Sequence, residues 1–120
     1  MITYSLNNDG IFYVTFSGIV TVEDIENYLL DFEKLSNLPQ DLRALYNLRS
    51  ADMKLTHDDL IYISELTNKA TAVYKTVRTA FLVDEPKITA YSIIFTEQLT
   101  SSKTKRKVFS TESAALSWLK

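Results

Sequence analysis

The sequence contains no cysteine, and among its 120 residues it has only two glycines, two prolines and one histidine. Without cysteine, disulfide bonds, thiol nucleophiles and cysteine metal sites are all excluded. Two glycines are too few for a glycine-rich phosphate-binding loop or a Gly-x-Ser-x-Gly nucleophile elbow. So little glycine and proline also excludes a collagen-like or low-complexity chain.

Long apolar runs are missing as well. The longest are short, such as residues 80–83, whereas a membrane-spanning helix needs roughly 18 apolar residues in succession. The first residues also lack the charged and apolar regions of a secretory signal. We therefore expect a cytoplasmic protein with no membrane span.

The composition is that of a soluble globular protein, with 46% hydrophobic and 23% charged residues. Such a chain is too apolar to be disordered, and its length fits a single domain over residues 1–120. Thirteen Lys and Arg residues against fifteen Asp and Glu residues give a net charge of −2. Because the protein has no overall basic field, the charge predicts no binding to nucleic acid or to an anionic membrane surface.

The N-terminal region has the pattern of a β-hairpin. Residues 2–6 and 11–16 each have the two-residue period of a strand. The Asp-Gly pair at residues 9–10 lies between them and is typical of a tight turn. The pattern predicts two antiparallel strands, and we expect Gly18 to end the second one.

The rest of the chain alternates between helix and strand patterns. Apolar residues recur at helical spacing over 22–35, 57–74 and 86–99, and a last short helix begins near residue 112. Strand patterns cover 42–48, 77–83 and 105–109. The order β-β-α-β-α-β-α-β-α predicts an α/β fold, with a mixed, mostly parallel sheet of about five strands and about four helices. The first strand is the expected antiparallel exception, and the strand order stays open.

Capping residues mark where these helices begin. Thr21 and Thr56 are each followed three residues later by an aspartate, Asp24 or Asp59, which is the spacing of a capping box. The other start signals are Pro86 and, for the last helix, Ser110 or Thr111.

Three stretches of the sequence resemble parts of the STAS domain, the fold of bacterial anti-sigma-factor antagonists. Residues 9–18 resemble its second strand with a closing glycine, and residues 78–86 resemble its fourth strand entering a helix. Residues 108–119 resemble its last strand and an Ala-x-x-Trp-Leu helix. The chain is most similar to the SpoIIAA-like, or STAS/SEC14, group of small stand-alone bacterial proteins. The resemblance implies a STAS-like fold over the whole chain and a non-enzymatic regulatory or protein-interaction module.

The resemblance also draws attention to one segment. In the antagonists, a phosphorylatable serine lies in an Asp-Ser-Ser-Gly turn after the third strand. The matching residues 52–59 lack that turn, and the nearest hydroxyl groups belong to Thr56 and Ser50. Thr56 is the candidate phospho-acceptor, although Asp58 and Asp59 would repel a phosphate group beside them.

We expect an unknown protein partner to contact this segment through Ser50, Thr56, His57, Asp58 and Asp59, because a helix N-terminus presents unpaired N–H groups. The alternative is that Thr56 is an ordinary N-cap and that the aspartates complement the helix dipole. His57 is the only histidine, and neighbouring residues on a helix do not face one another, so it has no positioned partner for general-base catalysis. The pattern therefore predicts no catalytic residue, no metal site and no cofactor.

A small basic cluster lies near the last strand. It comprises Lys103, Lys105, Arg106 and Lys107. Such a cluster can contact an anionic lipid, an RNA or an acidic partner. We favour the alternative that these residues protect an edge strand from pairing with another sheet.

A second function hypothesis concerns a small apolar ligand. Ile61, Tyr62 and Ile94 lie off the main apolar stripes of their helices. They are candidates to line a pocket between the second and third helices or a surface for self-association into a homodimer. Because the related SEC14-type fold holds lipids, the resemblance implies a carrier of a small apolar ligand, such as a fatty acid, as the alternative to a partner-binding module. Ordinary packing of these side chains is the third interpretation.

Overall fold

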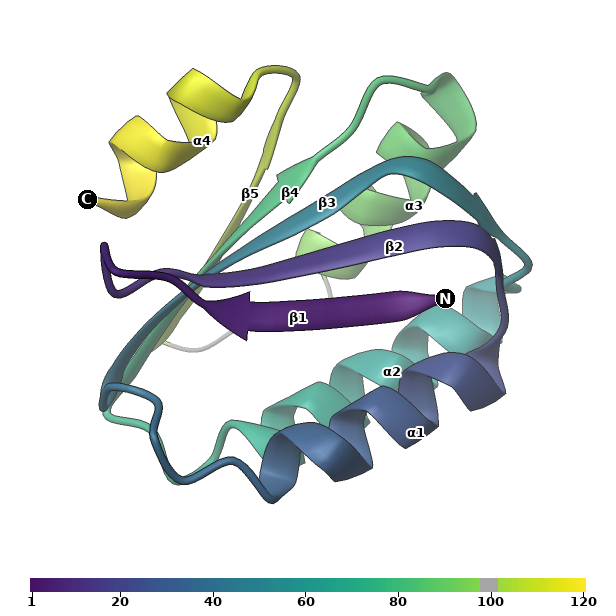
Figure 1. Ribbon diagram of the computed structural model, residues 1–120. Coiled ribbons are helices and arrows are strands. Elements are labelled where there is room, and N and C mark those ends of the chain that lie inside the picture. Colours follow the sequence, from purple (N-terminus) through teal and green to yellow (C-terminus); the bar gives the residue numbers. More distant parts are fainter. Residues whose placement is uncertain (98–101) are drawn as a thin grey trace.

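The computed structural model describes the backbone of residues 1–97 and 102–120, and the side chains of residues 1–93 and 102–120. Its elements follow the predicted order (Figure 1). They are β1 (Ile2–Leu6), β2 (Phe12–Val20), α1 (Val22–Glu33), β3 (Asp41–Met53), α2 (His57–Ala70), β4 (Thr76–Leu82), α3 (Pro86–Glu97), β5 (Thr104–Phe109) and α4 (Glu112–Leu119). No helix in this described part of the chain is both long enough and apolar enough to cross a bilayer. Leu99, predicted to belong to the third helix, lies outside the described residues.

The five strands form one sheet in the order β1-β2-β3-β4-β5. β1 pairs with β2 in antiparallel fashion, which confirms the predicted hairpin, and the other three pairs are parallel. Each parallel connection therefore steps to the next strand in the same direction. Because such crossovers are almost always right-handed, α1, α2 and α3 lie on one face of the sheet. Figure 1 shows α4 on the opposite face.

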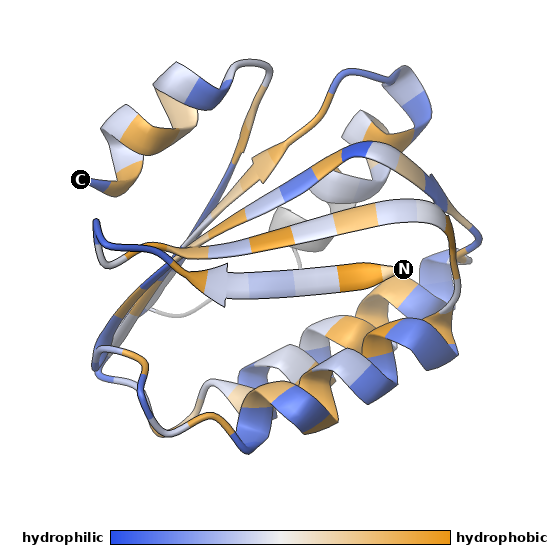
Figure 2. Ribbon diagram, in the orientation of Figure 1, coloured by the Kyte–Doolittle hydropathy of each residue, from blue (hydrophilic) through white to orange (hydrophobic). Residues whose placement is uncertain are grey.

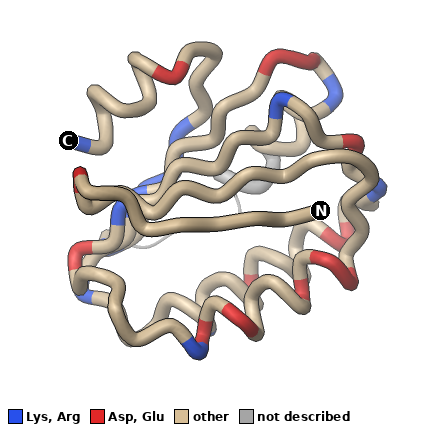
Figure 3. The backbone as a smooth tube through the Cα atoms, in the orientation of Figure 1, with Lys and Arg blue, Asp and Glu red and all other residues tan. Residues whose placement is uncertain are grey.

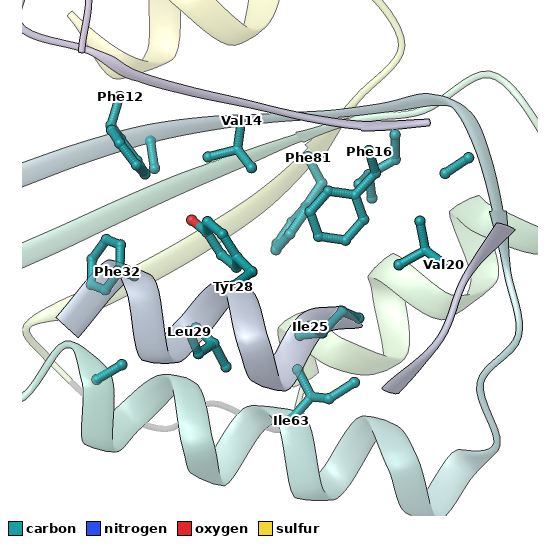
Figure 4. Packing of buried hydrophobic residues seen from close by; sticks show 14 of the residues in the cluster. Phe12, Val14, Phe16, Val20, Ile25, Tyr28, Leu29, Phe32, Ile63 and Phe81 are labelled. Atoms are coloured by element: carbon teal, nitrogen blue, oxygen red, sulfur yellow. The ribbon is translucent and has the colours of Figure 1, made fainter. Parts of the chain in front are cut away.

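The sheet separates two hydrophobic clusters. The larger cluster packs one face of the sheet against α1, α2 and α3, and Figure 4 shows Tyr28, Leu29 and Phe32 of α1 among these buried residues. The smaller cluster packs the other face against Ala115 and Leu119 of α4. In Figure 2, hydrophilic residues lie along the outer sides of α1 and α2, as expected for helices with one buried face.

The two predicted capping boxes are both present. The Thr21 hydroxyl accepts a hydrogen bond from the Asp24 N–H at 3.3 Å, and the Asp24 carboxylate accepts from the Thr21 N–H at 2.9 Å. Thr56 and Asp59 make the same reciprocal pair at 3.1 and 2.9 Å. These bonds satisfy donors that the first turn of a helix leaves unpaired. Thr111, rather than Ser110, caps α4.

The prediction that Gly18 ends the second strand is wrong. β2 continues through Gly18 to Val20, and β3 extends beside it to Met53. Gly18 has a φ of +67°, which only glycine adopts without strain, so the chain absorbs an irregularity inside the strand instead of stopping there. The β2–β3 register shifts between Thr15 and Ser17, directly before this glycine.

The end of α2 also differs from the prediction. The helix stops at Ala70 instead of reaching Tyr74. The Thr71 hydroxyl donates to the carbonyl of Thr67 at 2.8 Å, and the ammonium group of Lys103 donates to three carbonyls just beyond the helix. These belong to Thr71, Ala72 and Tyr74, at 3.2, 3.1 and 2.8 Å. Lys103 thus caps the C-terminal end of α2, where the helix dipole favours a cation, and does not shield the sheet edge.

Replacing Lys103 by methionine removes this cap while keeping a side chain of similar length. We expect Lys103→Met to lower the free energy of unfolding by about 1–2 kcal/mol, because three carbonyls lose a charged donor. Urea denaturation followed by circular dichroism measures the change. The matched control is Lys105→Met, at an exposed position two residues further on in β5, which should have little effect. Equal losses in the two variants would contradict the capping role.

Candidate functional site

The inner face of the sheet has small side chains between large ones. Ala44 on β3 pairs with Thr79 on β4, and Thr79 pairs with Arg106 on β5. The next inward residues along β3 are the larger Leu42 and Tyr46. Because side chains on one face of a sheet stand beside their cross-strand partners, the small Ala44 and Thr79 leave room beneath the helices.

A cavity of about 80 Å³ occupies this room, between the sheet and the helices of the larger cluster. Most of its lining is apolar or aromatic. These residues include Phe16, Ile25, Tyr28, Leu29, Phe32, Leu42, Ala44, Tyr46, Leu48, Met53, Leu55, Leu60, Ile63, Val77, Phe81 and Tyr91. The other lining residues are Thr67, Thr71, Thr79, Ser92 and Arg106. The cavity therefore combines an apolar wall with a few polar groups, which is the usual character of a small-molecule site.

Four of the lining residues with polar side chains are called the polar corner: Tyr28, Tyr46, Thr79 and Arg106. The hydroxyl oxygens of Tyr28 and Tyr46 lie 2.7 Å apart and share one hydrogen bond. Two phenols carry two protons, and this bond uses only one of them. No other hydrogen bond of either hydroxyl occurs among the residues that the structure describes, so the second proton is available to an acceptor.

Thr79 differs from the other small hydroxyl residues of the lining. Thr67, Thr71 and Ser92 each donate to a carbonyl one turn earlier in their own helix. Thr79 is 7% exposed as a whole residue, and no hydrogen bond between described residues involves its hydroxyl. The Thr79 oxygen is not among the fully buried side-chain atoms that lack a partner, so a water or a ligand in the cavity can reach it.

Arg106 brings a positive charge to the cavity. It is half-buried on β5. Burial lowers the pKa of its guanidinium to about 10, and the nearby Tyr46 acts in the opposite direction. At neutral pH the group therefore stays cationic. A cation beside an apolar wall favours a ligand that is anionic at one end and apolar elsewhere.

Comparisons with known proteins bear on the fold. No family model matches the chain, and no curated protein matches it. A solved structure does match: an uncharacterised protein of the DUF3478 family with a SpoIIAA-like fold, from Shewanella loihica PV-4. The two chains superpose with a TM-score of 0.64 and 19% identity, over 100% of this chain and 93% of the other. The chain has a SpoIIAA-like fold. This confirms the predicted fold class, and at this identity it extends to the fold alone.

Within the SpoIIAA-like fold, the predicted contact segment is divided between structural and exposed residues. Thr56 and Asp59 are held in the capping box of α2, so the Thr56 hydroxyl already accepts a hydrogen bond from the helix. His57, Asp58 and Ser50 are exposed and make no contact with the cavity. The exposed part of the segment is thus a surface at one end of α2, separate from the polar corner.

Two of the residues predicted to line an apolar pocket, Ile61 and Tyr62, are not among those that line the cavity. Tyr62 is 42% exposed, and its hydroxyl donates to the Glu26 carboxylate at 2.6 Å, which links α2 to α1. Ile61 is half-buried, and neither side chain lines the cavity. The side chain of Ile94 lies outside the described residues. The cavity lies between the helices and the sheet. The predicted pocket instead concerns residues off the apolar stripes of the helices.

Sequence reasoning did not select the polar corner, although one signal for it was present. Arg106 was grouped with neighbouring lysines as a basic cluster, yet Lys105 and Lys107 are exposed and Arg106 lines the cavity. Alternation along β5 puts Arg106 on the face of Thr104 and Val108, the inward face. Among the described residues, no group of three or more histidines and carboxylates gathers as a metal site would require.

The buried tyrosines predict a loss of stability at alkaline pH. Burial raises the pKa of Tyr28 well above its ordinary value of 10.0, with further contributions from Tyr46. Burial also raises the pKa of Tyr46. A phenol with a raised folded-state pKa stabilises the fold below pH 10, and this stability is lost as pH rises and the unfolded chain ionises.

We therefore expect Tyr28 and Tyr46 to ionise in the same alkaline step in which the fold is lost. Tyrosinate absorbance and circular dichroism, recorded in one titration, measure the two processes. In Tyr28→Phe, the unfolding-linked step should lose the absorbance of one tyrosinate. Full ionisation of all tyrosines while the circular dichroism remains native would contradict the burial of this pair.

Proposed function

We propose that this chain is a cytoplasmic, non-catalytic binding module that holds one small, largely apolar molecule between the sheet and α1, α2 and α3. The supporting observation is the cavity of about 80 Å³ with the polar corner in its wall. Protein interiors contain few voids larger than a water molecule. At ~24 cal/mol per Å³ of cavity, this space corresponds to roughly 2 kcal/mol of lost packing, which a fitting ligand would restore.

The size of the cavity limits the occupant. An apolar cavity of roughly 150 Å³ is enough for benzene, and the space here is about 80 Å³. A molecule with a handful of heavy atoms fits this volume, whereas a long-chain fatty acid does not. The expected ligand is therefore a short-chain or small cyclic molecule and not a lipid in general.

Methyl NMR tests the proposal directly. Titration with 1-butanol should shift the methyl resonances of Leu48 and Ile63, which line the cavity, in a saturable way. The methyl groups of Ile11 and Leu119, packed on the α4 side of the sheet, should stay in place and serve as the control within the same spectrum. Bound ligand should also raise the melting temperature, because it binds only the folded state.

A cavity-filling variant sharpens this test. Ala44→Val places two extra methyl groups in the wall between Leu42 and Tyr46, so butanol should bind more weakly while the melting temperature without ligand stays the same or rises. If the Ala44→Val variant is overpacked and unstable, the pattern of methyl shifts in the unmodified protein still tests whether butanol binds in the cavity. Shifts spread equally over both faces of the sheet, or none up to the solubility limit of butanol, would contradict the proposal.

A second candidate function is contact with a protein partner through the exposed end of α2. β3 extends beyond β4: the last β3–β4 pair is Asn47 with Leu82, and residues 50–53 pair with β2 alone. Ile19, opposite Asp52 in this extension, is 63% exposed. Acidic residues follow the solvent side of α1 in Figure 3. An apolar residue beside exposed acidic groups favours a basic partner with an apolar anchor.

The capping box limits which aspartate can be replaced in a test of this second function. Asp58 can be reversed in charge without loss of the cap, whereas Asp59 cannot. We expect Ile19→Ser combined with Asp58→Lys to weaken partner capture at least about tenfold with little change in stability. Affinity capture compares this variant with Glu33→Lys, a charge reversal at the far end of α1. Equal capture by both variants would exclude the surface.

A further inference from the structure

We infer that β1 is an edge for self-association, at which a second copy of this chain pairs its own β1 in antiparallel fashion, with Tyr4 on the two-fold axis. The pairing joins two five-stranded sheets into one continuous sheet. It concerns the edge of the sheet and is independent of the cavity and its ligand. Its support comes from the outward backbone groups of β1, from the order of its side chains and from the charges of the opposite edge.

The backbone of β1 has hydrogen-bonding groups that β2 does not use. In the described part of the chain β1 pairs with β2 alone, and Figure 1 shows it at the edge of the sheet. At the end of the hairpin, the Asn7 N–H donates to the Ile11 carbonyl at 3.0 Å. Along an antiparallel ladder, hydrogen-bonded and non-hydrogen-bonded pairs alternate. The N–H and C=O groups of Ile2, Tyr4 and Leu6 therefore point away from β2, toward the edge.

The side chains of β1 have a symmetric order. From Ile2 to Leu6 they are apolar, polar, aromatic, polar and apolar, so the pattern is the same in both directions from Tyr4. In an antiparallel pair centred on Tyr4, Ile2 lies opposite Leu6 of the second copy, and Thr3 lies opposite Ser5. The outward backbone groups of Ile2, Tyr4 and Leu6 all form hydrogen bonds in this register. A two-fold interface requires this kind of self-complementarity.

The same register covers apolar side chains at the rim of the inner face. Tyr4 packs against Phe12 and Tyr28, with ring centroids 5.6 and 5.8 Å away. Even so, Tyr4 remains 38% exposed and Leu6 remains 36% exposed. Directly opposite residues of an antiparallel pair lie on one face of the sheet and contact each other. Tyr4 therefore meets Tyr4 of the second copy, and Leu6 meets its Ile2.

The two edges of the sheet differ in charge. β1 has no charged side chain (Figure 3) and no proline, whereas β5, at the other end of the strand order, has the exposed Lys105 and Lys107. Charged residues, lysine above all, prevent pairing at the edges of natural sheets. Two copies can therefore meet at β1 without bringing charged side chains of the strand together. Because the lysine-bearing strand then lies at both ends of the joined sheet, the assembly stops at a dimer.

Sedimentation velocity at increasing protein concentration tests for the dimer. A pair of short strands gives a small interface, so we expect a reversible dimer with a dissociation constant of about 1–100 µM. Amide hydrogen exchange at low and high concentration then locates the contact. The Tyr4 N–H should exchange several-fold more slowly where the dimer dominates. The Val108 N–H, which points away from β4 because the Phe109 carbonyl bonds to β4, is the control and should not change.

Charges introduced on the outer face test the register. Thr3 and Ser5 are exposed and lie opposite each other across the axis. Thr3→Lys together with Ser5→Lys puts like charges opposite each other, and the dimer should weaken at least about tenfold. Thr3→Lys together with Ser5→Glu puts opposite charges there and should restore dimerisation. Glu65→Lys, at an exposed position of α2, changes the net charge as much as the first variant and should dimerise like the unmodified chain.

Three results would overturn the inference. One is a protein that sediments as a monomer up to about 1 mM. Another is a dimer that forms without slower exchange of the Tyr4 N–H. The third is a dimer that the lysine pair leaves intact or that the lysine–glutamate pair does not restore. Circular dichroism confirms that each variant is folded. If the lysine pair does not fold, the exchange of the Tyr4 N–H in the unmodified protein decides.

Discussion

The direction of the three parallel connections is the constraint on which the rest of the structure depends. Each connection joins a strand to its immediate neighbour, from β2 to β5 in order. Right-handed crossovers that always step the same way put α1, α2 and α3 together on one face. In the part of the chain that the structure describes, the other face packs against the short helix α4. One side of the sheet is therefore a thick layer of three helices, and only this side has the depth to enclose a cavity.

Within that thick layer, cross-strand pairing brings distant parts of the sequence to one place. Ala44, Thr79 and Arg106 come from three strands and stand side by side because the register aligns them. Tyr28 reaches the same space from α1 through its hydrogen bond with Tyr46. A larger apolar residue at the Ala44 position would fill the cavity with hydrocarbon. The hydroxyl groups of Tyr28, Tyr46 and Thr79 would then lie beside that hydrocarbon. The small residue and the polar groups thus line one and the same cavity.

Features that depend on near neighbours in the sequence could be predicted, and features that depend on distant ones could not. The capping boxes of Thr21 and Thr56 span three residues each, and both are present. The resemblance of short stretches to SpoIIAA-like proteins was enough for the fold. The continuation of β2 past Gly18 depends on pairing with β3, which a single strand pattern does not contain. The polar corner comes from four elements, so no local pattern distinguishes Arg106 from the lysines around it.

The ammonium of Lys103 has a consequence for how the last strand is held in register. The start of β5 is held by the bond from the Val77 N–H to the Lys103 carbonyl at 2.8 Å and by the contacts of Lys103 with the end of α2. Its far end is held by the bond from the Val83 N–H to the Phe109 carbonyl at 3.0 Å. These hydrogen bonds join β5 to β4 and to the end of α2. The crossover that contains α3 therefore begins and returns at points fixed by other elements. The register of the last strand is therefore held at both of its ends by bonds to β4, and at its start by Lys103 as well.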